Sequence, residues 1–81
     1  MTLLDLETKQ SGRVVSIEGG RALSHRLDSL GIREGVSISK IGSQFFRGPV
    51  IVSVNGHHTA LGWGIASRVN VSVSDTNKQT L

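Results

Sequence analysis

An amphipathic helix ends and a strand begins within ten residues of this chain, RLDSLGIREG at positions 26–35. Three leucines recur at the i, i+4 and i+7 spacing of one helix face: Leu23, Leu27 and Leu30. Gly31 follows at the position where a left-handed residue closes the last carbonyl groups of a helix, and Ile32 can fold back onto the leucines. The pattern predicts a helix over residues 21–30 whose leucine face packs against a β structure.

Short β-rich runs bounded by turn residues make up most of the remaining chain. They lie at residues 13–17, 36–41, 50–54, 57–61 and 69–73. Period-two alternation places Val15 and Ile17 of the first run on one face. The predicted fold is mainly β: a small SH3-like antiparallel β-barrel of about five strands with a helix inserted at about 21–30.

A hairpin turn is predicted between the third and fourth of these runs. Asn55 and Gly56 form the dipeptide that type I′ turns select, because both residues of that turn need a positive φ. Pro49 fits just before the third run, where no N–H inside the ladder is lost. The turn predicts the pairs Val54–His57, Val52–Thr59 and Val50–Leu61 on one face.

Size and composition limit the chain to one small domain. It has 81 residues, 37% of them hydrophobic, and no cysteine, so disulfides and thiolate metal sites are excluded. We expect a single domain over residues 1–74 and a polar, disordered tail at 75–81. No apolar run approaches the ~20 residues that span a bilayer, and the first residues lack the features of a signal peptide. The expectation is a cytoplasmic protein that is not inserted in a membrane.

The net charge is positive but not clustered. Nine Lys and Arg residues against six Asp and Glu residues give a formal charge of +3. The basic residues, Lys40 among them, are interpreted as solvated surface, because no short window holds the cluster that marks a nucleic-acid footprint. A nucleic-acid-binding SH3-like or OB-like barrel remains the alternative function. It is disfavoured because the outward strand positions carry serines rather than stacking aromatics, so we expect no nucleic-acid partner.

Residues able to bind a metal or to catalyse a reaction are few and dispersed. His57 and His58 carry imidazoles, which bind iron-group metals, but adjacent residues of a strand point to opposite faces and do not easily hold one ion. Ser24, His25 and Asp28 lie close together on the predicted helix. A catalytic triad also needs a pocket and an oxyanion hole, and a barrel this small fills its interior with side chains. We expect no catalytic residue, metal site, cofactor or enzymatic activity.

The aromatic residues are the best candidates for contact with a partner. Phe45 and Phe46 are adjacent in a polar loop, and Trp63 is a large apolar residue between two glycines. Each aromatic residue has two interpretations, as a cap on one end of the barrel or as an exposed interface anchor. The predicted partner-binding surface combines the aromatics with two basic residues: Phe45, Phe46, Arg47, Trp63 and Arg68. The substitution Lys40→Ala is expected not to weaken partner binding.

Several short segments occur in a characteristic order along the chain. They are TLLDL at 2–6, GRVVSI at 12–17, LGI at 30–32, GPV at 48–50 and VNG at 54–56. Their order and spacing resemble the ferrous-iron transport protein A (FeoA) family, from residue 2 to about residue 74. The chain departs from the family pattern at 62–64, GWG, where other members have a basic residue and a helical turn.

The resemblance implies an SH3-like FeoA domain with a role in bacterial ferrous-iron uptake. It implies a small accessory or regulatory protein that binds a membrane ferrous-iron transporter with a cytosolic GTP-binding domain. The same module resembles the C-terminal domain of metal-dependent repressors. An iron-carrying metallochaperone is disfavoured by the dispersed histidines. Whether the protein activates, inhibits or only assembles the transporter stays open at this point, as does its oligomeric state.

Overall fold

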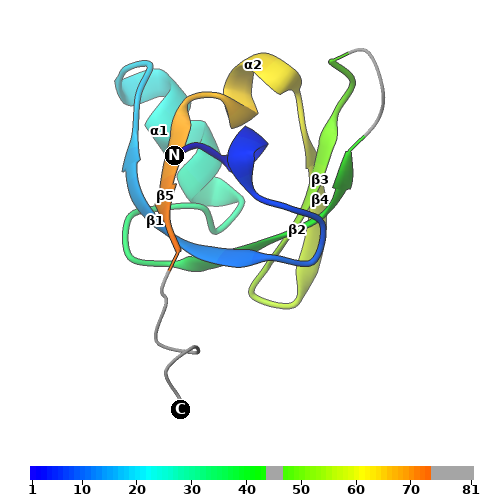
Figure 1. Cartoon of the computed structure of the whole chain (residues 1–81). Helices are drawn as coiled ribbons and strands as arrows, with labels where there is room; N and C mark the ends of the chain where they lie inside the picture. Colours follow the sequence, from blue (N-terminus) through cyan, green and yellow to red (C-terminus); the bar gives the residue numbers. More distant parts are fainter. Residues whose placement is uncertain (44–46, 74–81) are drawn as a thin grey trace.

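Five antiparallel strands form one curved sheet in the computed structural model, which describes residues 1–43 and 47–73. The elements are η1 (Leu3–Asp5), β1 (Ser11–Ile17), α1 (Arg21–Ser29), β2 (Ser37–Ser43), β3 (Val50–Val54), β4 (His57–Leu61), α2 (Trp63–Ala66) and β5 (Val69–Ser72). The strand order is β4-β3-β2-β1-β5. Figure 1 shows the sheet curving around the helical segments, so the predicted mainly β fold with an inserted helix is confirmed. The predicted tail at 75–81 lies outside the described residues.

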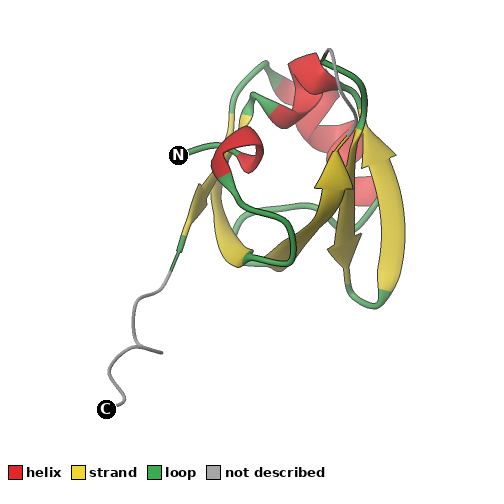
Figure 2. Cartoon of the chain, turned by 45° about the vertical axis from the view of Figure 1, so that its right-hand side comes forward, coloured by secondary structure: helices red, strands yellow, loops and turns green. Residues whose placement is uncertain are grey.

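One hydrophobic core lies inside the curved sheet, and every strand and helix contributes to it. Its members are Leu3, Leu6, Val14, Leu27, Ile32, Ile38, Val50, Val52, Val54, Leu61, Ala66, Val69 and Val71. Figure 2 shows the helical segments in the upper part of the molecule, at the same height as the upper ends of the strands. A capping box holds η1 in place, because Thr2 N donates to Asp5 Oδ2 at 2.8 Å and Leu4 N donates to Thr2 Oγ1 at 3.2 Å.

The C-terminus of α1 is closed by a Schellman motif around Gly31, which has a φ of 87°. Gly31 N donates to Asp28 O and Ile32 N donates to Leu27 O, both at 2.9 Å. Leu27 and Ile32 are both buried, which supplies the hydrophobic contact that accompanies this motif. The predicted helix end is confirmed, and the motif directs the chain from α1 toward β2.

The buried face of α1 is narrower than predicted. Leu27 is buried and Leu23 packs against the core, but Leu30 is 44% exposed. Leu30 is the C-cap residue, where the backbone leaves helical geometry, and the fully buried Ile32 packs at the helix end instead. The prediction that Leu30 joins the buried face is therefore wrong.

A β-bulge in β1 breaks the alternation of inward and outward residues. The register against β5 shifts between Val14 and Ser16, which leaves Val15 as the extra residue. Val15 is 49% exposed, whereas Ile17 lies opposite the buried Val69 and packs against the core. The prediction that Val15 and Ile17 share one face is therefore wrong.

The hairpin of β3 and β4 has the predicted turn and register. Asn55 and Gly56 have φ values of 52° and 81°, as a type I′ turn requires. The three predicted pairs are all present: Val54–His57, Val52–Thr59 and Val50–Leu61. Because Val52 is fully buried, its partner Thr59 lies on the core side of β4.

Lys40 is the one charged residue among those described that is buried, with 7% of its surface exposed. Its Nζ donates to Leu6 O at 2.7 Å and to Leu4 O at 3.1 Å. The backbone N of Lys40 also donates to Gln10 O at 3.0 Å. The side chain therefore ties the N-terminal segment to β2, and the interpretation of Lys40 as solvated surface is wrong.

We expect Lys40→Met to lower the free energy of unfolding by roughly 1–3 kcal/mol. Methionine has a similar length but no donor, so the carbonyls of Leu4 and Leu6 would lose their side-chain partner. Urea denaturation followed by circular dichroism measures the change. Lys9→Met is the matched control, because Lys9 is exposed. Equal stability of the two variants would contradict a structural role for the buried ammonium.

Candidate docking surface

Trp63 is the first residue of α2 and is 39% exposed. The helix follows Gly62, whose backbone is extended, and Ala66 N donates to Gly62 O at 2.9 Å. Ala66, at the other end of α2, is fully buried. The helix therefore packs through its alanine side and leaves Trp63 partly in solvent, as an interface anchor requires.

The two basic residues of the predicted surface lie in different surroundings. Arg47 is exposed, and the described residues 47–49, which lead into β3, lie at the end of the molecule that carries α2 in Figures 1 and 2. Arg68 is exposed after α2, and its side chain lies near the β1–α1 connection, since a Cβ added at Gly19 would be 3.1 Å from Arg68 Nη1. Phe45 and Phe46 lie outside the described residues. Residues 47–49 thus lie at the same end as α2, whereas Arg68 lies near the start of α1.

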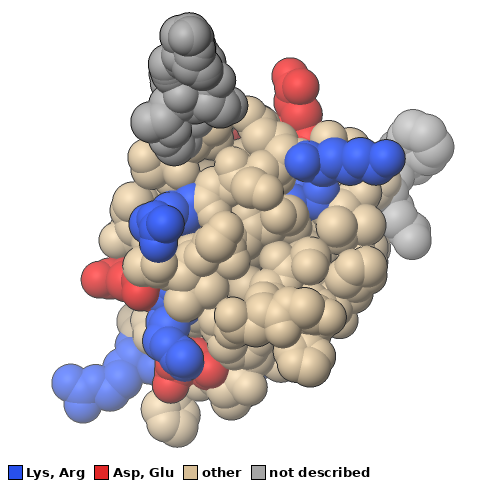
Figure 3. Space-filling view, turned by 90° about the horizontal axis from the view of Figure 1, so that it is seen from below, with Lys and Arg blue, Asp and Glu red and all other residues tan. Residues whose placement is uncertain are grey.

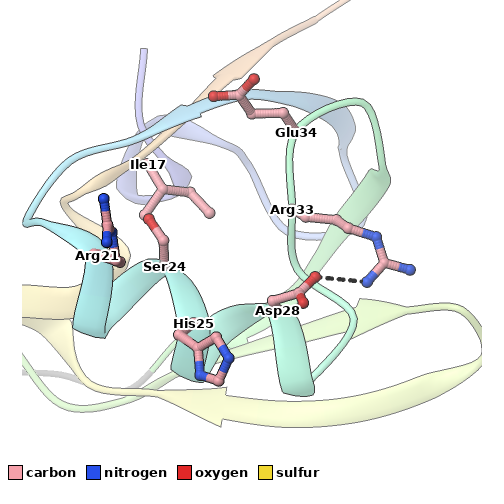
Figure 4. Close-up of a pocket in the computed structure, with 7 residues that line it drawn as sticks. All are labelled: Ile17, Arg21, Ser24, His25, Asp28, Arg33 and Glu34. Atoms are coloured by element: carbon pink, nitrogen blue, oxygen red, sulfur yellow. Dashed lines mark hydrogen bonds and ion pairs between the residues drawn. The ribbon is translucent and has the colours of Figure 1, made fainter.

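A hollow of about 470 Å³ beside α1 is a second candidate surface, shown in Figure 4. Its lining residues are Ile17, Arg21, Ser24, His25, Asp28, Arg33 and Glu34. Arg33 Nη1 donates to Asp28 Oδ1 at 2.7 Å, so this carboxylate is already paired. In the described part of the chain, no hydrogen bond joins Ser24, His25 and Asp28. Sequence reasoning missed the hollow because it depends on how the turn after Gly31 sets Arg33 against α1.

Candidate metal ligands do not gather in the described structure. Within residues 1–43 and 47–73, no three His, Cys, Asp or Glu side chains lie close enough to hold one ion. His57 and His58 are both exposed on β4, opposite Val54 and Ser53 of β3. Because adjacent strand residues point to opposite faces, the two imidazoles do not converge.

Titration with ferrous iron or Zn²⁺ is expected to give no saturable binding tighter than about micromolar. A few dispersed imidazoles without thiolates do not form the closed ligand set of a tight site. Anaerobic isothermal titration calorimetry on the whole chain measures the affinity. A tighter site that is lost in His57→Ala or His58→Ala would contradict this expectation and favour an iron carrier.

Charged side chains of both signs are interspersed on the face shown in Figure 3, which views the molecule from below. Lys and Arg side chains lie next to Asp and Glu side chains, and uncharged surface separates these groups. No continuous basic stripe crosses that face, as a nucleic-acid groove would require.

None of the helices among the described residues combines the length and apolar character needed to cross a membrane.

Comparison with known proteins places the chain among relatives of the same architecture. The FeoA domain model matches residues 1–73. A crystal structure of the iron uptake regulatory protein FeoA is 36% identical, with a TM-score of 0.80 over 89% of this chain and 93% of that one. FeoA of Stenotrophomonas maltophilia, crystallised with zinc, is 29% identical, with a TM-score of 0.75 over 89% of each chain. A search of curated protein sequences finds no match.

The structural likeness also confirms the type of barrel. The Stenotrophomonas maltophilia protein is described as an SH3 domain protein, so the predicted SH3-like β fold is confirmed. A manganese-dependent transcriptional repressor has a TM-score of 0.82 at 19% identity, over 91% of this chain and 41% of that one. At that identity the likeness concerns the fold alone.

Proposed function

This chain belongs to the FeoA family, and on that premise we propose that it is an accessory protein of bacterial ferrous-iron uptake. It acts in the cytoplasm by binding the cytosolic part of the membrane iron transporter, which carries a GTP-binding domain. The observation that carries the proposal is the FeoA domain match over residues 1–73. Two similar proteins support it: one is named an iron uptake regulatory protein, and the other a candidate activating factor of ferrous iron transport.

The proposed docking surface lies at the end of the molecule that carries α2 and residues 47–49, which lead into β3. Trp63 is its central anchor, because it is a large apolar side chain that remains 39% exposed. Arg47 supplies a basic rim at the same end, and Phe45, Phe46 and Arg68 are further proposed members. An aromatic anchor with polar or basic neighbours is the usual composition of an interface centre and its rim.

Nucleic-acid binding is the less favoured function. Single-stranded nucleic acids are bound by stacking aromatics on a barrel face within a basic groove. Among residues 1–43 and 47–73, Trp63 is the single Phe, Trp or Tyr residue, and it lies on α2 rather than on a strand. The charges on the face in Figure 3 are mixed in sign. Both observations favour a protein partner over a nucleic acid.

Uptake of ferrous iron by cells that lack this protein tests the proposed role. We expect uptake to change while the amount of transporter stays constant, because the protein acts on an existing transporter. Supplying the wild-type chain or the Leu30→Ala variant should restore the normal rate, whereas Trp63→Ala should not. Unchanged uptake in the deletion strain would contradict the proposal.

A further inference from the structure

The two ends of the curved sheet differ in how their outer edges are covered. The outer edge of β5 is covered by the first residues of the chain, since Thr2 bridges Asn70 and Val71 N donates to Met1 O at 2.8 Å. At the opposite end of the sheet, β4 has β3 as its single strand neighbour among the described residues. Within residues 1–43 and 47–73, the outer edge of β4 is therefore unpaired.

The hairpin determines which backbone groups of β4 point outward. The type I′ turn closes with a hydrogen bond between Val54 and His57, so this pair is hydrogen-bonded, and the bonding alternates along the ladder. Thr59, opposite Val52, therefore also directs its N–H and C=O groups toward β3. The N–H and C=O groups of His58 and Ala60 point away from the sheet. They are the groups that a further strand would bind.

The β4 edge carries no charged residue, proline or bulge, which are common means of preventing strand addition. The five residues His57–Leu61 include no Lys, Arg, Asp, Glu or Pro. The register against β3 runs from Val50–Leu61 to Val54–His57 without a bulge. Edge strands that stay unpaired are commonly protected by such charges, prolines or bulges. This edge is therefore suited to pairing.

We propose that β4 pairs antiparallel with β4 of a second copy of this chain, with the two-fold axis passing through Thr59. In this register His58 lies opposite Ala60 of the second copy, and Ala60 lies opposite its His58. Each of these pairs exchanges two backbone hydrogen bonds. The outward N–H and C=O groups of one copy thus bind the same groups of the second copy, related by the two-fold axis. This inference does not rest on the proposed function.

In other registers, fewer of the outward backbone N–H and C=O groups of β4 form hydrogen bonds. If the pairing is shifted by one residue, each residue whose N–H and C=O groups point toward the second copy lies opposite a residue whose groups point away from it. A shift by two would bring Gly56 of the turn or Gly62 before α2 into the ladder and lose one of the two complementary pairs. Because the β5 edge is already covered, pairing through β4 closes on itself and gives a dimer rather than a fibre.

A cysteine at the two-fold axis tests the register. The chain has no cysteine, so Thr59→Cys introduces a single thiol. In the proposed dimer the two Cα atoms at position 59 form a non-hydrogen-bonded pair about 4.5 Å apart, within the range that a disulfide spans. We expect oxidised glutathione to convert Thr59→Cys to a covalent dimer at least tenfold faster than the control Ala60→Cys, as seen on non-reducing gels.

Ala60→Cys is a suitable control, because random collisions between monomers would link it faster than Thr59→Cys. Ala60 is exposed and Thr59 is half-buried, so thiols that meet by chance would link faster at position 60. In the dimer, the two Cα atoms at position 60 are about 8 Å apart, beyond the reach of a disulfide. Faster linkage of Ala60→Cys, or equal rates for two variants whose circular dichroism is native, would overturn the proposal.

Sedimentation of the unlinked chain gives a second test that needs no cysteine. The average mass of the wild type should rise toward that of a dimer with increasing concentration. Ala60→Pro should stay monomeric, because proline removes an outward N–H and is tolerated at such edge positions. A wild type that remains monomeric at all concentrations, as expected if β4 instead accepts an extended segment of another protein, would overturn the dimer. So would an Ala60→Pro variant that dimerises like the wild type.

Discussion

We expect Leu27→Ala to lower the free energy of unfolding by about 2–5 kcal/mol. Leu27 is 2% exposed, and its backbone O accepts the hydrogen bond from Ile32 N that closes α1. Removing its side chain leaves a cavity between the helix and the curved sheet. In a domain of this size each kcal/mol shifts the melting temperature by about 4–8 °C. Thermal denaturation followed by circular dichroism should therefore show a fall in melting temperature of about 8 °C or more.

Leu30→Ala is the matched control for this cavity. It removes the same atoms from the next leucine of the predicted stripe, but Leu30 is 44% exposed. Its effect on the free energy of unfolding should stay within about 0.5 kcal/mol, as for most surface substitutions. If Leu27→Ala melted within a few degrees of the wild type, α1 would not be part of the core.

Trp63→Ala should weaken binding to the cytosolic part of the transporter roughly thirtyfold, because loss of an interface anchor costs about 2 kcal/mol or more. Phe46→Ala is expected to have a similar effect. Leu30→Ala again serves as the control, since its exposure of 44% is close to the 39% of Trp63. The Lys40→Ala variant is unsuitable as a control, because Lys40 is buried and holds the carbonyls of Leu4 and Leu6. Circular dichroism must show that each variant is folded.

Unchanged affinity in both folded aromatic variants would move the docking surface elsewhere. The hollow beside α1, which includes Arg21 and His25, would then be the first alternative. Arg21→Ala and His25→Ala would test it directly.

Features that depend on neighbouring residues were predictable from the sequence. The helix end at Gly31 and the turn at Asn55 and Gly56 each need a positive φ within a short segment, and the residues that permit it stand in the sequence. The bulge at Val15 was not predictable, because it depends on how β1 pairs with β5, more than fifty residues away. Leu30 was misplaced because the helical period stops at the C-cap.

The burial of Lys40 could not be predicted from the sequence, because it too depends on residues that are distant along the chain. A lysine between β-rich residues is usually exposed. Here its ammonium reaches the carbonyls of Leu4 and Leu6, which the fold brings next to β2. At the candidate docking surface, the sequence indicated Trp63 as an unusual apolar residue. Its exposure followed only from the way α2 packs through Ala66.

The most direct test of the proposed function is a calorimetric titration of this chain into the purified cytosolic part of the transporter, with and without GTP. We expect saturable binding in at least one nucleotide state, weakened by Trp63→Ala and preserved by Leu30→Ala. Absence of saturable binding in both states, with each protein folded, would show that this protein does not act by docking on the transporter.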